Sequence, residues 1–409
     1  MGVVQPADPL EILLFSWDGG GNVPPFLALG RHLLARGHRV RMVGHDSIAA
    51  RAGAAGVDFA AFGGVPSWSP RPGRALEDEM EALAAHLLGP EFGDELLAAT
   101  NRSRPHALVV DCMAGGSLSV AEHLGLPAAV LVHLRARFHF DAGGGSSLAT
   151  RAPRESLNRQ RVRLGLDPLP VEQSWWGALW RRAGQVFIAS LPELEGAGEP
   201  LPEDFTYVGG VFDPEPADLP GDVVELIARA GGPLVVVSLS TTYMHQEPQI
   251  AAALGALDGL RGVLSIGDGL ELKDPESRYV VVARWVPHQS LLPHADLVVT
   301  HAGHGTVMAA LAAGVPLVCL PMGRDQHGTA EQVAAVGAGV SLDSSSDATH
   351  LRSAIDRVLT ERSFRRCAEN LAASMRRLGG AYRLAAEVEA LARPEPLVRA
   401  HQTAARKRF

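Results

Sequence analysis

The sequence predicts an α/β protein built from two doubly wound, Rossmann-like domains that face each other across a cleft. Near-continuous apolar runs alternate with helical patterns along the chain, which is typical of parallel strands covered on both faces. A segment rich in prolines and acidic residues, VFDPEPADLPGD, interrupts this alternation near the middle. The length of 409 residues is too great for one ordinary domain and comfortable for two.

In the first half, the apolar run EILLF precedes a helical pattern over residues 25–37, where Phe26, Leu29 and Leu33 fall on one side. Pro24 and Pro25 stand where a helix tolerates proline, in its first turn. The runs RVRMVGH, HALVVD and PAAVLVH follow, with helical stretches between them. Open α/β sheets bind ligands at the carboxyl ends of their strands, so the residues after these runs are the candidate site residues.

The second half repeats this organisation with a different sequence. Its strand-like runs are PLVVVSLS, GVLSI, YVVVARW, DLVVTH, VPLVCL and AGVSL. We predict a first domain over residues 1–212, a linker over 213–220, a second domain over 221–380, and a C-terminal helix with a charged tail over 381–409.

The composition and net charge indicate which kinds of partner the protein does not bind. Hydrophobic residues at 46% and charged residues at 20% describe a globular protein, and a net charge of −8 argues against a nucleic-acid partner. No basic start with an apolar stretch resembles a signal peptide, and no apolar run is long enough to span a membrane. Three cysteines without CxxC pairing fit a reducing compartment, so we expect a cytoplasmic protein without a membrane partner. The oligomeric state stays open, a homodimer being one arrangement.

The segment THAGHGT is the most informative one for chemistry. A buried strand ends at His301, and a loop with Gly303 and Gly305 opens a helix that carries Thr306. Backbone amides at a helix start, together with the positive end of the helix dipole, bind phosphate well. His301 and His304 can add hydrogen bonds to a diphosphate without a metal ion.

The next strand ends in LPMGRDQ, which brings Asp325 and Gln326 to the same edge of the sheet. A carboxylate beside an amide is suited to bidentate recognition of sugar hydroxyls. His301, His304 and His327 lack the spacing and the cysteine or carboxylate partners of a zinc site, so we expect no metal.

These residues carry a resemblance. The pattern H-x-G-x-G-T followed by P-x-x-x-D-Q, about 40 residues in order, resembles the donor-binding signature of family 1 glycosyltransferases with the GT-B fold, and the whole chain looks like bacterial enzymes that glycosylate natural products. The resemblance implies that Trp285 stacks on the nucleotide base, that the backbone of Val286 pairs with it, and that Thr241 contacts phosphate. His288 stands where the family usually has a glutamine.

The resemblance also raises a question about the base. In that family, the turn after the first strand carries a histidine that deprotonates the acceptor hydroxyl, and the aligned residue here is Asn22 in GGGNVPP. Asp111, at the end of HALVVD, matches the aspartate that pairs with that histidine, and it can serve as the base directly or through water. Asp18, in the turn itself, is a second candidate. A third route needs no protein base, because an acidic phenol or enol can react as its anion.

His133, His139 and Asp141 follow the next strand and are expected near the acceptor pocket, without assigned roles. Trp175, Trp176 and Trp180 belong either to the core or to the acceptor wall.

The resemblance thus implies an inverting, metal-independent hexosyltransferase with no cofactor, whose co-substrate is a TDP- or UDP-sugar and whose acceptor is a hydrophobic small molecule. Three alternatives stay open. GGGNVP nearly matches a dinucleotide fingerprint but has Pro24 in the place of the third glycine. A nucleotide-sugar epimerase shares the architecture, and a helper protein that binds sugar nucleotide without turnover would explain Asn22. The sugar, the acceptor and the choice between an oxygen and a carbon acceptor atom are not encoded in recognisable motifs.

Overall fold

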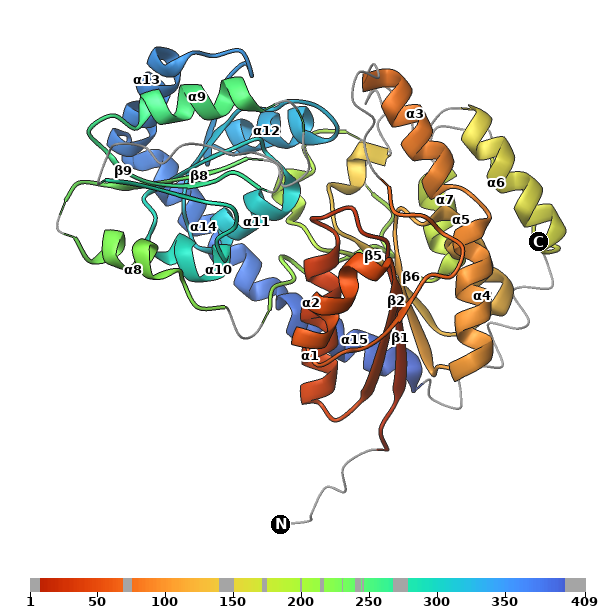
Figure 1. Cartoon of the computed structure of the whole chain (residues 1–409). Helices are drawn as coiled ribbons and strands as arrows, with labels where there is room; N and C mark the ends of the chain where they lie inside the picture. Colours follow the sequence, from red (N-terminus) through yellow and green to blue (C-terminus); the bar gives the residue numbers. More distant parts are fainter. Residues whose placement is uncertain are drawn as a thin grey trace, which may run out of the picture.

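The structure is a computed structural model that describes residues 8–68, 76–139, 151–170, 175–198, 201–213, 217–229, 231–239, 244, 246–267 and 279–393. Its strands form two separate sheets, one in each half of the chain, and all strand pairings among the described residues are parallel. Figure 1 shows the two halves side by side, each with helices on both faces of its sheet. The predicted fold class is confirmed.

The first sheet has seven strands in the order β3-β2-β1-β4-β5-β6-β7. They are β1 (Glu11–Phe15), β2 (Arg39–Gly44), β3 (Asp58–Ala61), β4 (Ala107–Asp111), β5 (Ala128–Val132), β6 (Gln185–Ile188) and β7 (Thr206–Tyr207). Alternate residues of a strand point to opposite faces, so Leu13 and Phe15 enter one core cluster while Ile12 and Leu14 enter the other. The strands β1, β4 and β5 are consecutive neighbours, which brings their carboxyl ends together.

Seven α-helices of the first half cover this sheet. They are α1 (Val23–Ala35), α2 (Ala49–Ala54), α3 (Leu76–Leu87), α4 (Glu91–Ser103), α5 (Gly115–Leu124), α6 (Arg151–Arg163) and α7 (Trp175–Ala183). Short 3₁₀ turns are η1 (Asp46–Ile48), η2 (Ala136–His139) and η4 (Pro192–Leu194). The first helix starts two residues before the predicted one and ends where the chain turns at Gly37, whose φ is 86°.

The three tryptophans of α7 belong to the core. Trp176 and Trp180 have no exposed surface, Trp175 is 2% exposed, and all three pack in the same cluster as Phe15. The indole Nε1 of Trp180 donates a hydrogen bond to the carbonyl of Cys112 at 2.9 Å. This bond ties α7 to the carboxyl end of β4.

The second sheet has six strands in the order β10-β9-β8-β11-β12-β13. They are β8 (Leu234–Ser238), β9 (Arg261–Ser265), β10 (Val280–Ala283), β11 (Leu297–Thr300), β12 (Leu317–Cys319) and β13 (Gly339–Ser341). The other elements of this half are α8 (Gly221–Ala228), α9 (Glu247–Ala256), α10 (His288–Leu291), η5 (Leu292–His294), α11 (His304–Ala312), α12 (Gln326–Ala335), α13 (Ala348–Thr360) and α14 (Arg362–Leu378). The neighbours β11 and β12 end beside each other, where the sequence predicts the donor site.

The last helix, α15 (Gly380–Ala392), returns to the first half (Figure 1). Its buried face, from Ala381 to Val388, packs in the core cluster that contains Val23 and Phe26 of α1. Gly379, with φ of 87°, allows the sharp turn after α14. The C-terminal helix is therefore part of the packing of the first half, although the sequence suggested only a separate terminal segment.

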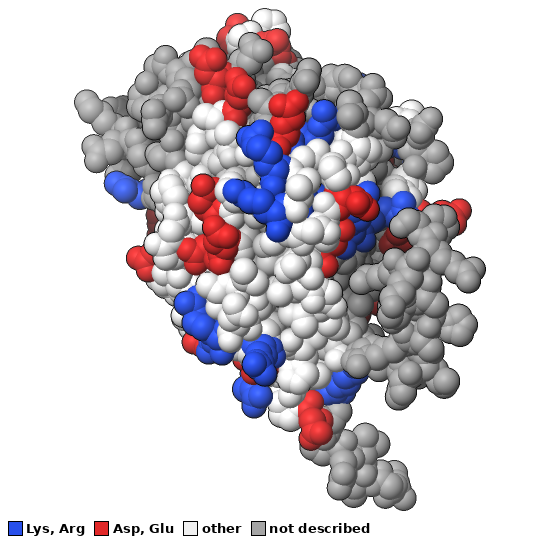
Figure 2. All heavy atoms as spheres, turned by 90° about the vertical axis from the view of Figure 1, so that its right-hand side faces the viewer, with Lys and Arg blue, Asp and Glu red and all other residues white. Residues whose placement is uncertain are grey.

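On the face that Figure 2 shows, positive and negative side chains are interspersed among uncharged ones. The described residues of this face therefore form no large basic patch of the kind that binds nucleic acid. Among the described helices, none has the length and apolar character that a membrane span requires.

Candidate active site

The carboxylate of Asp111 is the centre of a hydrogen-bonded network at the end of β4. Its Oδ2 accepts from Ser16 Oγ at 2.8 Å and from Asn22 Nδ2 at 2.9 Å. Its Oδ1 accepts from the backbone N–H of Met113 at 2.9 Å and lies 3.0 Å from His133 Nε2. The side chain has no exposed surface. Burial alone would raise the pKa of Asp111, but the charge of His133 and the hydrogen bonds together hold this pKa below its usual value.

Asn22, which stands in the place of the expected histidine, is part of this network. Its Nδ2 also donates to Trp17 O at 2.7 Å and lies 3.1 Å from Ser16 Oγ, while its Oδ1 accepts from Gly19 N–H at 2.9 Å. The residue is only 4% exposed. Asn22 therefore holds the turn before α1 against the end of β4.

His133, the first residue after β5, completes the network from the neighbouring strand. Its side chain is 9% exposed. Burial alone would lower the pKa of His133, but Cys112 and Asp111 beside it raise this pKa well above the usual value. Burial raises the pKa of the Cys112 thiol, which keeps it neutral, so the carboxylate of Asp111 is the anion that retains the proton on His133.

Asp111, Cys112 and His133 also form a group whose potential metal-ligating atoms lie within 4.8 Å of one another. Both oxygens of Asp111 already have two hydrogen-bond partners each. The arrangement fits a hydrogen-bonded histidine–carboxylate pair better than a metal centre.

Asp18, the second candidate base, lies in an ion pair on the other side of the same turn. Its Oδ2 accepts from Ser47 Oγ at 2.6 Å and from Arg51 Nη2 at 2.7 Å. Burial would raise the pKa of Asp18, but these two partners and the Gly20 N–H lower it overall. The backbone N–H of Asp18 donates to His45 Nδ1 at 2.9 Å. These contacts make Asp18 a brace of the turn, and its predicted catalytic role stays untested.

On the second sheet, the residues after β11 form a polar corner at the start of α11. Gly303 is the N-cap of α11, and Gly305 and Thr306 lie in its first turn, where backbone N–H groups have no partner within the helix. Ala302 has φ of 65°, a left-handed conformation that non-glycine residues rarely adopt. A Cβ on Gly303 would lie 2.3 Å from His301 Nε2, so the imidazole in its present position packs directly against this glycine.

The two histidines of this corner are neutral and have unused nitrogens. Burial lowers the pKa of His301 and of His304 to about 4 each. The Nδ1 atoms of both are shielded from water, and neither has a hydrogen-bond partner among the described residues. Buried polar atoms of this kind are costly unless a ligand satisfies them.

Asp325 and Gln326 lie together at the start of α12, after β12. Burial raises the pKa of Asp325, while the positive charges of Arg324, His133 and Arg135 oppose this rise. Gln326 is 3% exposed, and its Oε1 accepts from the backbone of Met322 at 2.8 Å and of Gly323 at 3.1 Å. The structure thus uses the carbonyl end of Gln326 to shape the loop.

The remaining predicted donor residues follow β10. Trp285 is 62% exposed, the largest exposure among the apolar side chains near this edge, whereas Val286 is 1% exposed. His288 Nε2 lies 2.9 Å from Ser238 Oγ at the end of β8, and burial lowers the pKa of His288 to about 4. Thr241 lies outside the described residues.

The two halves meet at these strand ends. His304 Nε2 lies 3.0 Å from the carbonyl oxygen of Ala189, just after β6. The charge of His133 adds to the burial that lowers the pKa of His304, and it also acts on Asp325. A Cβ on Gly328 of α12 would lie 2.4 Å from the guanidinium of Arg135. The site predicted from the two sequence halves is therefore contiguous.

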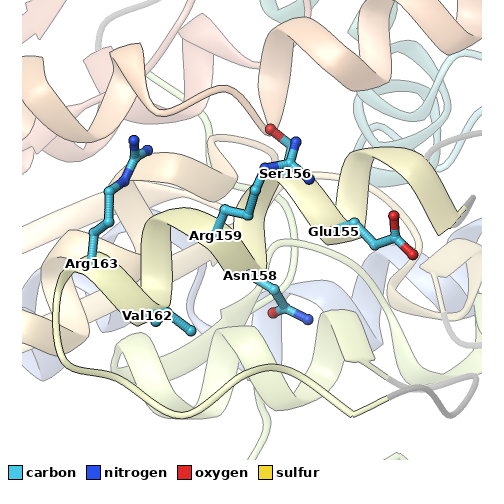
Figure 3. A pocket seen from close by; sticks show the side chains of 6 residues that line it. All are labelled: Glu155, Ser156, Asn158, Arg159, Val162 and Arg163. Carbon is cyan, nitrogen blue, oxygen red and sulfur yellow. The ribbon is translucent and has the colours of Figure 1, made fainter.

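A hollow of about 640 Å³ lies elsewhere, along α6. Figure 3 shows its lining side chains, which come from this one helix: Glu155, Ser156, Asn158, Arg159, Val162 and Arg163. It lies at neither set of strand ends and contains none of the predicted site residues, so we do not assign it a role.

Comparison with known proteins agrees with this arrangement. Residues 270–391 match the family described as "Erythromycin biosynthesis protein CIII-like, C-terminal domain". The chain is 28% identical over 394 residues to 4'-demethylrebeccamycin synthase of Lentzea aerocolonigenes, which covers 87% of this chain and 93% of the relative. It is 36% identical over 213 residues to demethyllactenocin mycarosyltransferase of Streptomyces fradiae, covering 47% and 45%. The solved structure of CalG4, the calicheamicin glycosyltransferase, matches with a TM-score of 0.74 and 26% identity over 94% of this chain and 98% of that one.

The chain is thus similar to natural-product glycosyltransferases in sequence, and to a glycosyltransferase of the GT-B fold in structure. The resemblance that the motifs suggested is thereby confirmed.

For this glycosyltransferase, the predicted donor residues that the structure describes lie at one edge of the second sheet, and Asp111 with Asn22 lies at the facing edge. The residue that the sequence left without a role is His133. The signal was present, because the histidine directly follows an apolar run that is the next strand after HALVVD. Only the strand order places it beside Asp111.

Proposed function

We propose that this glycosyltransferase binds a TDP- or UDP-sugar at the ends of β10, β11 and β12. In this proposal, Trp285 and the Val286 backbone hold the base, and the first turn of α11 with His301, Gly303, Gly305 and Thr306 holds the diphosphate. Asp325 and Gln326 would bind the sugar hydroxyls, and Thr241 would add a phosphate contact. The observation that carries the proposal is the start of α11, where backbone N–H groups have no partner within the helix and the shielded Nδ1 atoms of His301 and His304 have no partner among the described residues.

The reaction that fits this site is transfer of a hexose, with inversion at the anomeric carbon, to a hydrophobic small molecule. The relatives' names point to the same class: one is a mycarosyltransferase, and another is the synthase of 4'-demethylrebeccamycin. Hydrogen bonds from fixed N–H groups stabilise the charge that develops on the diphosphate as it leaves. Because the backbone amides at the start of α11, with the positive end of the helix dipole, supply these donors, the proposed reaction does not require a metal.

The first test is an initial-rate assay with TDP-glucose and UDP-glucose as donors and simple phenols as acceptors. Product NMR should show the anomeric configuration opposite to that of the donor, and a chelator should leave the rate unchanged within about twofold. Retention, or loss of activity that added metal restores, would contradict the inverting or metal-independent part of the proposal. Tight nucleotide binding with no transfer would favour a helper protein instead.

The donor site has its own test, His301→Ala. Removal of one preorganised donor to a developing oxyanion typically costs about 100- to 1,000-fold in kcat. We expect a loss of this size in kcat/KM and weaker binding of TDP by calorimetry. The exposed His294, at the end of η5, provides the matched control His294→Ala, for which rates and binding should stay unchanged. If the two variants behave equally, His301 does not bind the diphosphate.

A further inference from the structure

His133 lies beside Asp111 at the carboxyl ends of the first sheet and comes from a different strand than the turn that carries Asn22. It follows β5, the neighbour of β4 in the sheet, and its Nε2 lies 3.0 Å from Asp111 Oδ1. With Nε2 directed to the carboxylate, Nδ1 is the ring nitrogen left to take up a proton, and the side chain of Cys112, which also hydrogen-bonds to this imidazole, lies beside it. The side chain is 9% exposed, so it is not fully enclosed by the protein.

The imidazole also lies at the junction of the two halves. Its charge acts on His304, at the start of α11, and on Asp325, at the start of α12. Asp325 is the proposed partner of the sugar hydroxyls, and His304 belongs to the proposed diphosphate corner. A sugar held by these residues would therefore have His133 within the same small region, on the acceptor side.

Neither carboxylate candidate offers the same geometry. Asp111 has no exposed surface, and each of its oxygens has two partners within the protein. Asp18 is held by Arg51 and Ser47. A general base must lie within hydrogen-bond distance of the proton that it removes.

We infer that His133 is the catalytic base of the proposed glycosyl transfer and that Asp111 is its positioning residue. The inference rests on the proposed function. The Asp111 carboxylate fixes the ring orientation and stabilises the imidazolium, while Asn22 and Ser16 fix the carboxylate. Asn22 thus replaces the usual histidine in the network around Asp111 without taking over its chemistry.

The proposed step balances as follows. Nδ1 of neutral His133 accepts the proton of the acceptor hydroxyl, and the oxygen lone pair forms the new bond to the anomeric carbon. The bond from that carbon to the diphosphate oxygen breaks, and its electron pair leaves with the nucleoside diphosphate. The proton on His133 is then released to solvent.

The charged groups around His133 determine the pH dependence. Asp111 and Cys112 lie beside it from β4, and His304 and Asp325 face it from the second half. Because Asp111 holds the pKa of His133 above its usual value, the active neutral form increases with pH. The acid limb of the rate profile should therefore lie above pH 6.5, and removal of the Asp111 charge should move this limb to lower pH.

The decisive experiment compares His133→Gln with the exposed control His123→Gln, which lies at the end of α5 in the same half. General-base catalysis contributes about 100- to 10,000-fold. For unsubstituted phenol as acceptor, we expect His133→Gln to lower kcat by at least about 100-fold, with the KM for TDP-sugar and the TDP affinity unchanged. For 4-nitrophenol, which ionises without help, the loss should be less than about tenfold. His123→Gln should match the wild type for both acceptors.

A merely structural role would lower the rates for both phenols equally, and that result would overturn the inference. A loss below about threefold for phenol would do the same. Asp111→Asn provides the second variant, for which the acid limb of the rate profile should shift to lower pH while kcat falls. If the limb does not move, Asp111 does not act on the catalytic base and the inference is wrong. If the wild type transfers no sugar, both proposals fail. If it transfers sugar and His133→Gln is as fast, only this one fails.

Discussion

The carboxyl ends of the two sheets differ in how completely the protein satisfies its own polar groups. At the end of β4, Asp111 has four hydrogen-bond donors around it, and His133 is paired with it. At the end of β11, the Nδ1 atoms of the half-buried His301 and the buried His304 are shielded and have no partner among the described residues. The first region is organised before any ligand binds, whereas the second has hydrogen bonds still to make.

This difference has a physical consequence for the reaction. A base must be oriented before the acceptor arrives, so a complete network behind it is an advantage. A diphosphate brings two or more charges that must be stabilised, so unused donors around a helix start are what a donor site needs. The comparison therefore predicts that stability depends more on the first region and ligand binding more on the second.

The largest expected effect is on stability, in the pair Asp111→Ala and Asp325→Ala. Removing Asp111 leaves the buried imidazolium of His133 without its anion, and breaking a buried ion pair costs about 3–5 kcal/mol. Asp325 caps α12 without a side-chain hydrogen bond to the helix, so its removal should cost less than about 1 kcal/mol.

Urea unfolding followed by tryptophan fluorescence measures this, since five of the six tryptophans lie in the first half. Donor KM should respond in the opposite order, rising for Asp325→Ala. Similar losses of stability in the two variants would show that the two sheet edges do not differ in the proposed way.

A smaller effect concerns pH, and its sign is opposite in the two regions. Burial lowers the pKa of His304 to about 4 in the folded protein, below the value of about 6.5 in the unfolded chain. Its contribution is present above pH 6.5 and is lost as pH falls toward 4, by at most about 3 kcal/mol. The pKa of His133 is raised, so its contribution is present below pH 6.5 and is lost as pH rises through the folded value.

The unfolding free energies of wild type, His304→Ala and His133→Gln should be measured over pH 4–9. The difference of each variant from wild type gives the contribution of that histidine to stability at each pH. The His304 difference should shrink toward acid and the His133 difference toward alkali. The same slope for both would mean that the two histidines share one protonation state, contrary to the contacts described above.

The two sheet edges also differ in how well the sequence predicts which side chains meet there. His301, Gly303, Gly305 and Thr306 lie within six residues of the chain, so a local motif was enough to predict their shared corner. His133 and Asp111 lie 22 residues apart and Asn22 lies 89 residues from Asp111, so their network depends on the order β1-β4-β5 in the sheet. Periodicity predicted these strands individually but not which side chains meet. The same reason explains α15: its apolar face was visible, but not the core of the first half against which it packs.

The smallest expected effect comes from restoring the histidine that the turn lacks. Asn22→His places an imidazole beside Asp111 Oδ2, which Asn22 Nδ2 now contacts at 2.9 Å. Because His133 already supplies the base, the rate with phenol should change by less than about threefold in this single variant. In the His133→Gln background, the same substitution should raise kcat by about tenfold or more, since the Asp111 carboxylate would then orient the new imidazole. An increase of about 100-fold in the single variant would instead mean that the wild type works without a base, and that the turn after β1, rather than the end of β5, is where this reaction needs one.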